Sequence, residues 1–115
     1  MSTGMWGYEH AEGWAEGMDL TGYRVEAEDG HIGKVDKHSY EVDDGHIVVD
    51  TGPWIFGREV LLPAGVIQRV EEESHTVWVN RTKEQIKEAP TFQHESHLAD
   101  SDYRRNLGGY YGGRL

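Results

Sequence analysis

Residues 20–35 read LTGYRVEAEDGHIGKV, and this stretch decides the fold. It holds two apolar segments of strand length on either side of Asp29-Gly30, a pair that supplies the positive φ angles of tight hairpin turns. Four further strand-length segments follow at residues 47–49, 60–62, 66–70 and 76–79. A series of short strands separated by turn residues predicts a small closed β unit of about six strands.

Two local features refine this prediction. Gly33 lies inside the second strand and moves Ile32 and Val35 out of strict alternation, which indicates a bulge or a bend at a barrel corner. Residues 51–58 contain glycine and proline and predict a long loop between the third and fourth strands. Residues 72–75 are expected to form the last strand connection.

One short helix is predicted directly after the strands. Thr82 and Gln85 match the S/T-x-x-E/Q capping box, in which each side chain satisfies a backbone N–H at the helix start. Pro90 ends the helix at about Glu88. A helix this short is not stable alone, so we expect Ile86 to dock it on the barrel.

The chain has 115 residues and is expected to form a single domain with two tails. Residues 20–92 are apolar enough for a barrel-like domain, residues 1–19 form a flexible acidic arm, and residues 93–115 form a polar tail rich in Gly, Tyr and Arg. A core this small is marginal by itself. We therefore expect support from oligomerisation.

The net charge of −10 bears on the class of partner. Residues 21–79 carry 12 acidic and 5 basic side chains, so the barrel repels nucleic acid and anionic membranes. A protein partner or a cationic ligand fits this charge better. The chain has no cysteine, and it has no apolar stretch of transmembrane length or secretory leader pattern. We expect a soluble, cytoplasmic protein without a transmembrane segment.

The order of these motifs resembles the PRC-barrel family. The resemblance rests on the segment 20–25, on DGHIGKV at residues 29–35, on VLLP at residues 60–63 and on TKEQIKEAPTF at residues 82–92. It covers about two-thirds of the chain. It implies a small, strongly bent β-barrel like those in the cytoplasmic domain of the photosynthetic reaction-centre H subunit and in the C-terminal domain of a ribosome maturation factor.

The resemblance also implies a function class. Stand-alone bacterial members often form dimers, and the barrel acts as a docking unit rather than as a catalyst. This sequence departs from both characterised forms, because the first 19 residues provide neither the transmembrane helix of the H subunit nor the preceding β domain of the maturation factor. Those two specific roles are therefore not carried over.

Seven histidines raise the question of a metal site. His94 and His97 are weak candidate ligands, since a helix or turn would bring them together with nearby carboxylates. The alternative is that both are solvated tail residues. The histidines at positions 31, 38, 46 and 75 are spread over turns and strand faces, and we do not expect them to bind metal. No metal or other cofactor is expected.

Motifs for catalysis are absent from the sequence. It has no cysteine nucleophile, no G-x-S-x-G elbow and no phosphate-binding glycine loop. The adjacent carboxylates Asp43-Asp44 and Glu71–Glu73 are explained as solvated turns. We do not expect an enzyme.

The strongest candidates for partner binding are Trp54, Ile55 and Phe56, followed by Arg58. Large apolar side chains are unusual in a solvated Gly/Pro loop, and Trp and Arg are enriched in interface hot spots. The alternative is that this loop folds back and plugs one opening of the barrel.

The two tails offer further aromatic candidates. Trp6 and Trp14 either belong to a disordered arm or dock on the barrel or on a second subunit. Tyr110 and Tyr111 either belong to a disordered end, or contact a partner's sheet edge or an acidic surface, including that of the chain's own barrel.

The sequence thus favours a non-enzymatic docking or adaptor module that binds a protein partner and self-associates, most simply as a homodimer. One alternative is a small-ligand or metal-binding barrel. Another is a factor associated with ribosomes or RNA processing that acts through protein contacts, without binding nucleic acid directly.

Overall fold

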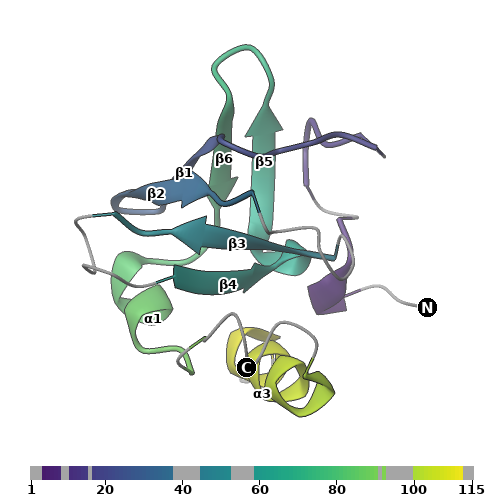
Figure 1. The fold of residues 1–115 in the computed structure, drawn as a ribbon, viewed down its shortest axis with the longest axis vertical. Coiled ribbons are helices and arrows are strands. Elements are labelled where there is room, and N and C mark those ends of the chain that lie inside the picture. Colours follow the sequence, from purple (N-terminus) through teal and green to yellow (C-terminus); the bar gives the residue numbers. More distant parts are fainter. Residues whose placement is uncertain are drawn as a thin grey trace.

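The computed structural model describes residues 4–8, 11–15, 17–37, 45–52, 59–90, 92 and 100–112. Within them, six strands form one sheet in the order β4-β3-β2-β1-β6-β5 (Figure 1). The strands are β1 (Arg24–Ala27), β2 (Gly30–Val35), β3 (His46–Asp50), β4 (Glu59–Pro63), β5 (Ile67–Glu71) and β6 (Thr76–Val79). The helical elements are the 3-10 turns η1 (Gly4–Trp6) and η2 (Ala64–Val66), and the α-helices α1 (Lys83–Lys87) and α3 (Ser101–Gly112). The predicted mainly β class with six strands is confirmed.

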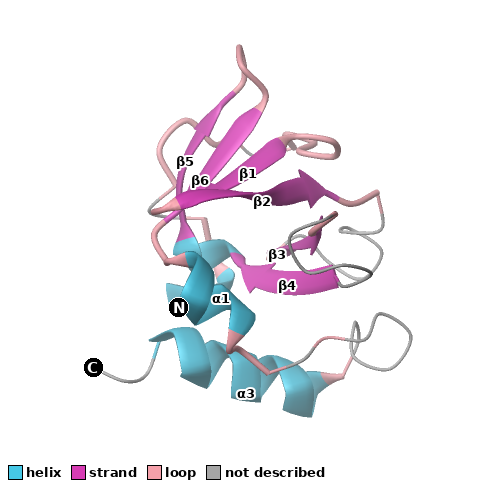
Figure 2. Cartoon of the chain, turned by 90° about the vertical axis from the view of Figure 1, so that its left-hand side faces the viewer, coloured by secondary structure: helices cyan, strands magenta, loops and turns pink. Residues whose placement is uncertain are grey.

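The sheet is curled into a half-barrel. Strand β1 pairs antiparallel with β2 and parallel with β6, and the other neighbours are antiparallel. The short turn η2 carries the chain from β4 to β5, the two strands at opposite ends of the sheet order. The strands β5, β6, β1 and β2 fan out at the top of Figure 2, with β3 and β4 below them and the helices at the bottom.

The predicted β1–β2 hairpin forms, but its turn lies one residue earlier than the predicted Asp29-Gly30, because Gly30 is already paired in β2. Ala27 pairs with Gly30, so Glu28 and Asp29 make the two-residue turn. The register then shifts between Val25 and Glu26, which leaves Ile32 as the extra residue of a bulge beside Gly33. The predicted bend at this point is confirmed.

The helix start also forms as predicted. Thr82 is the N-cap of α1, and both hydrogen bonds of the capping box to Gln85 are present. Glu88 is the C-cap, and Ile86 is fully buried in the core. Burial of a side chain of this size contributes about 1.5–3 kcal/mol, which is what a five-residue helix needs to stay folded.

The core lies inside the curled sheet. It is built from the inward-facing side chains of all six strands, closed by the helices, and its largest fully buried members are Leu20, Ile32, Ile47, Leu61, Leu62, Ile67, Ile86 and Leu107. Strand β3 is buried over residues 46–49, and at its start His46 contacts Arg104 of residues 101–112.

The second helix corrects the expectation of a flexible C-terminal tail. Residues 101–112 form α3, which lies beneath β4 in Figures 1 and 2. Tyr103, Leu107 and Tyr111 are spaced four residues apart and are all buried. Asp100 precedes them and accepts hydrogen bonds from the Asp102 and Tyr103 N–H groups. A capped amphipathic helix thus replaces the tail over these residues.

The described part of the N-terminal arm packs on the barrel. Trp6, Tyr8 and Trp14 are half-buried against the core, and the Tyr8 and Trp14 rings stack with centroids 4.2 Å apart. Trp6 lies next to Gly108 of α3, and the Arg104 guanidinium sits 4.5 Å from the centre of its ring. Of the two alternatives for these tryptophans, docking on the chain's own barrel is the one observed.

Candidate functional site

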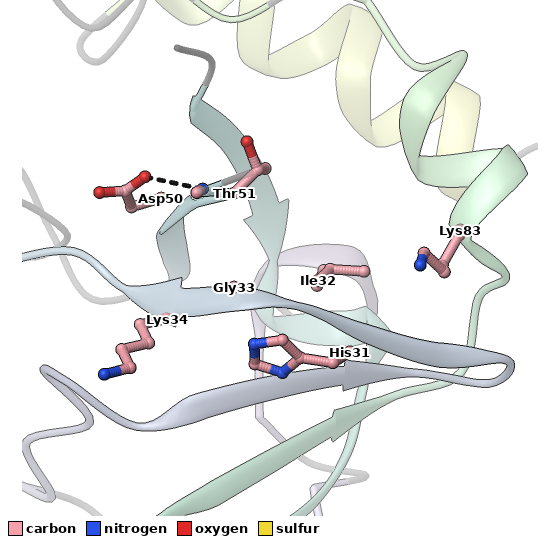
Figure 3. A pocket seen from close by; sticks show the side chains of 8 residues that line it. His31, Ile32, Gly33, Lys34, Asp50, Thr51 and Lys83 are labelled. Atoms are coloured by element: carbon pink, nitrogen blue, oxygen red, sulfur yellow. Dashed lines mark hydrogen bonds between the residues drawn. The ribbon is translucent and has the colours of Figure 1, made fainter. Parts of the chain in front are cut away.

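A pocket of about 450 Å³ opens where β2 and β3 separate (Figure 3). Among the described residues, β2 pairs with β3 only through Lys34–Asp50 and Val35–Val49. Gly30, His31 and Gly33 therefore have a strand partner on the β1 side alone, and Ile32 is the extra residue of the bulge. The pocket, named here the β2–α1 pocket, is lined by His31, Ile32, Gly33, Lys34, Asp50, Thr51, Gly52 and Lys83.

Gly33 determines how the two strands separate. Its φ is +154°, and a Cβ atom on it would lie 2.0 Å from the Asp50 carbonyl oxygen. The absence of a side chain thus lets β2 cross close to the end of β3 before the strands diverge. The sequence motif around Gly33 builds the pocket as well as the bend.

Lysine side chains stand at both ends of the pocket. Figure 3 shows Lys83 directed toward Ile32, while Lys34 and Asp50 lie at the opposite end. Lys83 is held there because its backbone N–H donates to the Asp29 carboxylate at 2.8 Å, which ties the start of α1 to the β1–β2 hairpin. The lining thus carries two lysines and one carboxylate, that of Asp50, which is the strand partner of Lys34.

The acidic and imidazole groups of the lining are each engaged locally. The Asp50 carboxylate accepts a hydrogen bond from the Gly52 N–H at 3.0 Å and so fixes the turn that leaves β3. The Nδ1 atom of His31 lies 2.8 Å from a Glu26 carboxylate oxygen, and Arg24 donates to the same oxygen at 3.1 Å. Arg24 and Glu26 both lie on β1, whereas the His31–Glu26 contact joins β2 to β1 and holds His31 beside the pocket. Exposed ion pairs of this kind contribute little to stability.

Shifted pKa values occur away from this lining. Hydrogen bonds from Thr21 lower the pKa of Asp19, and burial raises the pKa of Tyr23. A hydrogen bond with Glu84 raises the pKa of Glu88, and burial raises that of Tyr110. Each shift has a local structural cause, and none of these four groups lines the pocket. The pocket therefore combines charged side chains, backbone and one apolar side chain in a form suited to binding.

The metal prediction falls outside the described residues, since His94 and His97 are not among them. Within the described residues, no group of three or more His, Asp or Glu side chains is placed to hold a metal ion. His46 is fully buried at the start of β3, where its Nδ1 atom lies 3.3 Å from an Arg104 nitrogen. His75 lies exposed in the β5–β6 turn, where its ring meets the Tyr23 ring edge-on.

The strongest partner-binding candidates lie in the loop between β3 and β4. Trp54, Ile55, Phe56 and Arg58 lie outside the described residues, so the two alternatives for this loop stay open. Of the predicted loop 51–58, only Thr51 and Gly52 are described, and both line the pocket.

The two C-terminal tyrosines hold α3 to the barrel. Tyr110 is 38% exposed, and its hydroxyl donates to the Gln85 carbonyl at 2.6 Å. Tyr111 is buried, its carbonyl accepts a hydrogen bond from Arg81, and the Arg81 guanidinium lies over its ring. The expected disordered end is not what these residues form.

Sequence reasoning missed the two lysines of the pocket. Lys34 is one residue past Gly33, and Lys83 follows the helix cap, so both lie inside motifs that were identified for other reasons. Only the register of β2 against β3, and the attachment of α1 to the hairpin, bring them to one pocket.

No family model matches the chain, and no curated protein matches it. Among the described helices, none is long and apolar enough to cross a membrane.

Proposed function

We propose that the protein is a non-enzymatic docking module of the PRC-barrel kind, and that its β2–α1 pocket binds an acidic segment of a partner protein. The observation that carries this proposal is the gap between β2 and β3, which forms a pocket with a lysine at each end. The charge of the whole chain favours a cationic partner, but the charge of the pocket favours an anionic one.

The backbone supports binding of an extended segment. His31 and Gly33 of β2 are paired with β1 on one side, and both line the pocket. An extended peptide that enters the gap finds a strand to lie against, and this is the geometry of β-strand addition. Ile32 lies in the wall of the pocket and is itself fully buried in the core.

The charges support selection of an acidic segment. Lys34 and Lys83 attract carboxylates, and salt screens the distant acidic surface over about 8 Å at physiological ionic strength. Each exposed ion pair contributes about 0.2–1 kcal/mol, so two pairs determine selectivity more than they determine total affinity. Binding is expected to weaken as salt is added.

A second candidate function is the binding of a small anionic ligand. The pocket volume of about 450 Å³ lies within the range of about 300–1,000 Å³ that small-molecule sites occupy. The same lysines would hold its charge. A small-ligand site and a peptide site therefore share their chemistry and differ in the length of the occupant.

Fluorescence anisotropy with a labelled hexaglutamate peptide tests the proposal. We expect saturable binding that Lys34→Glu with Lys83→Glu weakens about tenfold or more, because two attractive contacts become repulsive. The matched control is Lys37→Glu with Lys87→Glu, which changes the net charge equally at two exposed positions outside the pocket. This control should weaken binding far less.

Competition with citrate and inorganic phosphate distinguishes docking of an acidic peptide from binding of a small anionic ligand. Displacement of the peptide only by other acidic peptides supports docking, and displacement by the small anions at low concentration supports the second candidate. Equal loss of peptide binding in the pocket variant and in the control variant would contradict both, because the response would then follow net charge alone.

A further inference from the structure

The β2–α1 pocket contains a histidine, His31, besides its two lysines. The His31 side chain is 47% exposed, so a bound segment can reach it. Across the β1–β2 hairpin, His31 pairs with Glu26 and Lys34 pairs with Arg24. Since Glu26 and Arg24 are two residues apart on β1, their partners lie on one face of the sheet, and Figure 3 shows both side chains on the same side of β2. An acidic segment that follows β2 past Lys34 therefore meets the His31 ring.

Glu26 determines where the proton of the neutral His31 ring lies. The Nδ1 atom is 2.8 Å from a Glu26 carboxylate oxygen, and Arg24 donates to the same oxygen at 3.1 Å. An ionised carboxylate only accepts hydrogen bonds, so the proton is on Nδ1 and Nε2 is an acceptor. The two nitrogens lie on opposite edges of the ring, so Nε2 points away from Glu26. Since β1 borders β2 on one side and the pocket borders it on the other, Nε2 is turned toward the pocket.

The protonation state of His31 changes what the pocket offers to a carboxylate. The neutral ring presents the lone pair of Nε2, whereas the protonated ring donates from both nitrogens and carries a positive charge. Histidine is the side-chain type that ordinarily changes charge between pH 5 and 8, while lysine, arginine and carboxylate side chains keep theirs. The other charged groups of the described residues that face this ring are Arg24 and Glu26 on β1, Lys34 on β2, Asp50 on β3 and Lys83 on α1.

We propose that His31 makes docking of an acidic segment pH-dependent, with tighter binding when its ring is protonated. This inference rests on the proposed docking function and adds a means of regulation to it. Protonation changes the lining from two cations and one carboxylate to three cations and one carboxylate. One additional exposed ion pair strengthens binding about two- to fivefold. The glutamates of a test peptide remain largely ionised above about pH 5.5, so they do not cause this change.

Anisotropy titrations with hexaglutamate at about pH 5.5 and about pH 8, at constant ionic strength, test the proposal. The dissociation constant of the unaltered protein should be about two- to fivefold lower at the acidic pH. His31→Asn should abolish this difference, because its amide N–H can still donate to Glu26 but does not titrate. The matched control is His75→Asn, at an exposed turn position outside the pocket where a φ of 53° suits asparagine. This control should keep the difference.

A dissociation constant of the unaltered protein that does not change with pH would overturn the role of His31, and so would a full pH response in His31→Asn. If Lys34→Glu with Lys83→Glu still weakens binding in that case, the docking function stands without this regulation. Absence of saturable binding at both pH values would overturn both proposals.

NMR of the imidazole nitrogens provides a second measurement that needs no peptide. At about pH 8 we expect the His31 proton on Nδ1, and a proton on Nε2 instead would overturn the proposal. Far-UV circular dichroism of each variant at both pH values distinguishes lost binding from unfolding.

Discussion

Gly33→Ala is the substitution that most directly probes how the pocket is built. The new methyl group would lie 2.0 Å from the Asp50 carbonyl oxygen and 2.9 Å from both the Asp50 carbonyl carbon and the Thr51 Cα. All three atoms belong to the backbone of β3 or of the turn after it, so relief requires β3 and β2 to move apart.

Two costs add in this variant. Overpacking of this kind costs about 1–3 kcal/mol. Holding a non-glycine residue at a φ of +154° costs a further amount of about 1–3 kcal/mol. The expected loss is thus about 2–6 kcal/mol, a large part of the stability of about 5–15 kcal/mol that is usual for a domain.

Urea unfolding, monitored by tryptophan fluorescence and circular dichroism, measures this loss in the free energy of unfolding. Gly52→Ala is the matched control, because Gly52 has a φ of +57° and no described atom within 4 Å of a Cβ position. It carries only the left-handed backbone cost of about 1–2 kcal/mol. If Gly33→Ala proves no more destabilising than Gly52→Ala, the close approach of β2 to β3 is wrong, and with it the origin of the pocket.

Three further substitutions test other parts of the fold. Thr82→Ala removes the capping box with Gln85 and should cost about 1 kcal/mol in urea unfolding. Leu107→Ala empties a buried position of α3 and should cost about 2–5 kcal/mol, whereas a free C-terminal tail would show no loss. Glu88→Gln should raise Tm slightly near neutral pH. The hydrogen bond with Glu84 raises the pKa of Glu88 above its usual value of 4.5. The protonated Glu88 therefore stabilises the fold, and this stabilisation is lost as pH rises and the carboxyl ionises. The gain should vanish at about pH 3, and a gain that is equal at both pH values would contradict this assignment.

Local sequence signals predict most of the barrel. The β1–β2 hairpin, the bulge beside Gly33 and the Thr82 cap all depend on neighbours in the chain, and the structure forms all three, with the hairpin turn one residue earlier than the sequence predicts. Helix α3 was missed because Gly108 and Gly109 disfavour a helix. Its signal was nevertheless present in the four-residue spacing of the buried side chains after a capping aspartate.

The candidate site was much less predictable. Lys34 and Lys83 are far apart in the chain, and only strand register and the Asp29 bond to α1 bring them to one pocket. The contact between the N-terminal arm and β5 likewise depends on the pairing of Glu12 with Arg69, which no periodic pattern in the sequence predicts. Contacts of this kind arise from tertiary packing, which propensity and spacing do not determine.

The central claim is that the β2–α1 pocket is a docking site for an acidic segment. NMR titration of the isotope-labelled protein with hexaglutamate tests this claim most directly. The measured quantity is the change in each amide chemical shift. The account predicts saturable shifts centred on residues 31–34, 50–52 and 83, which line the pocket. Shifts spread over all basic residues, or centred on α3 and the N-terminal arm, would contradict it.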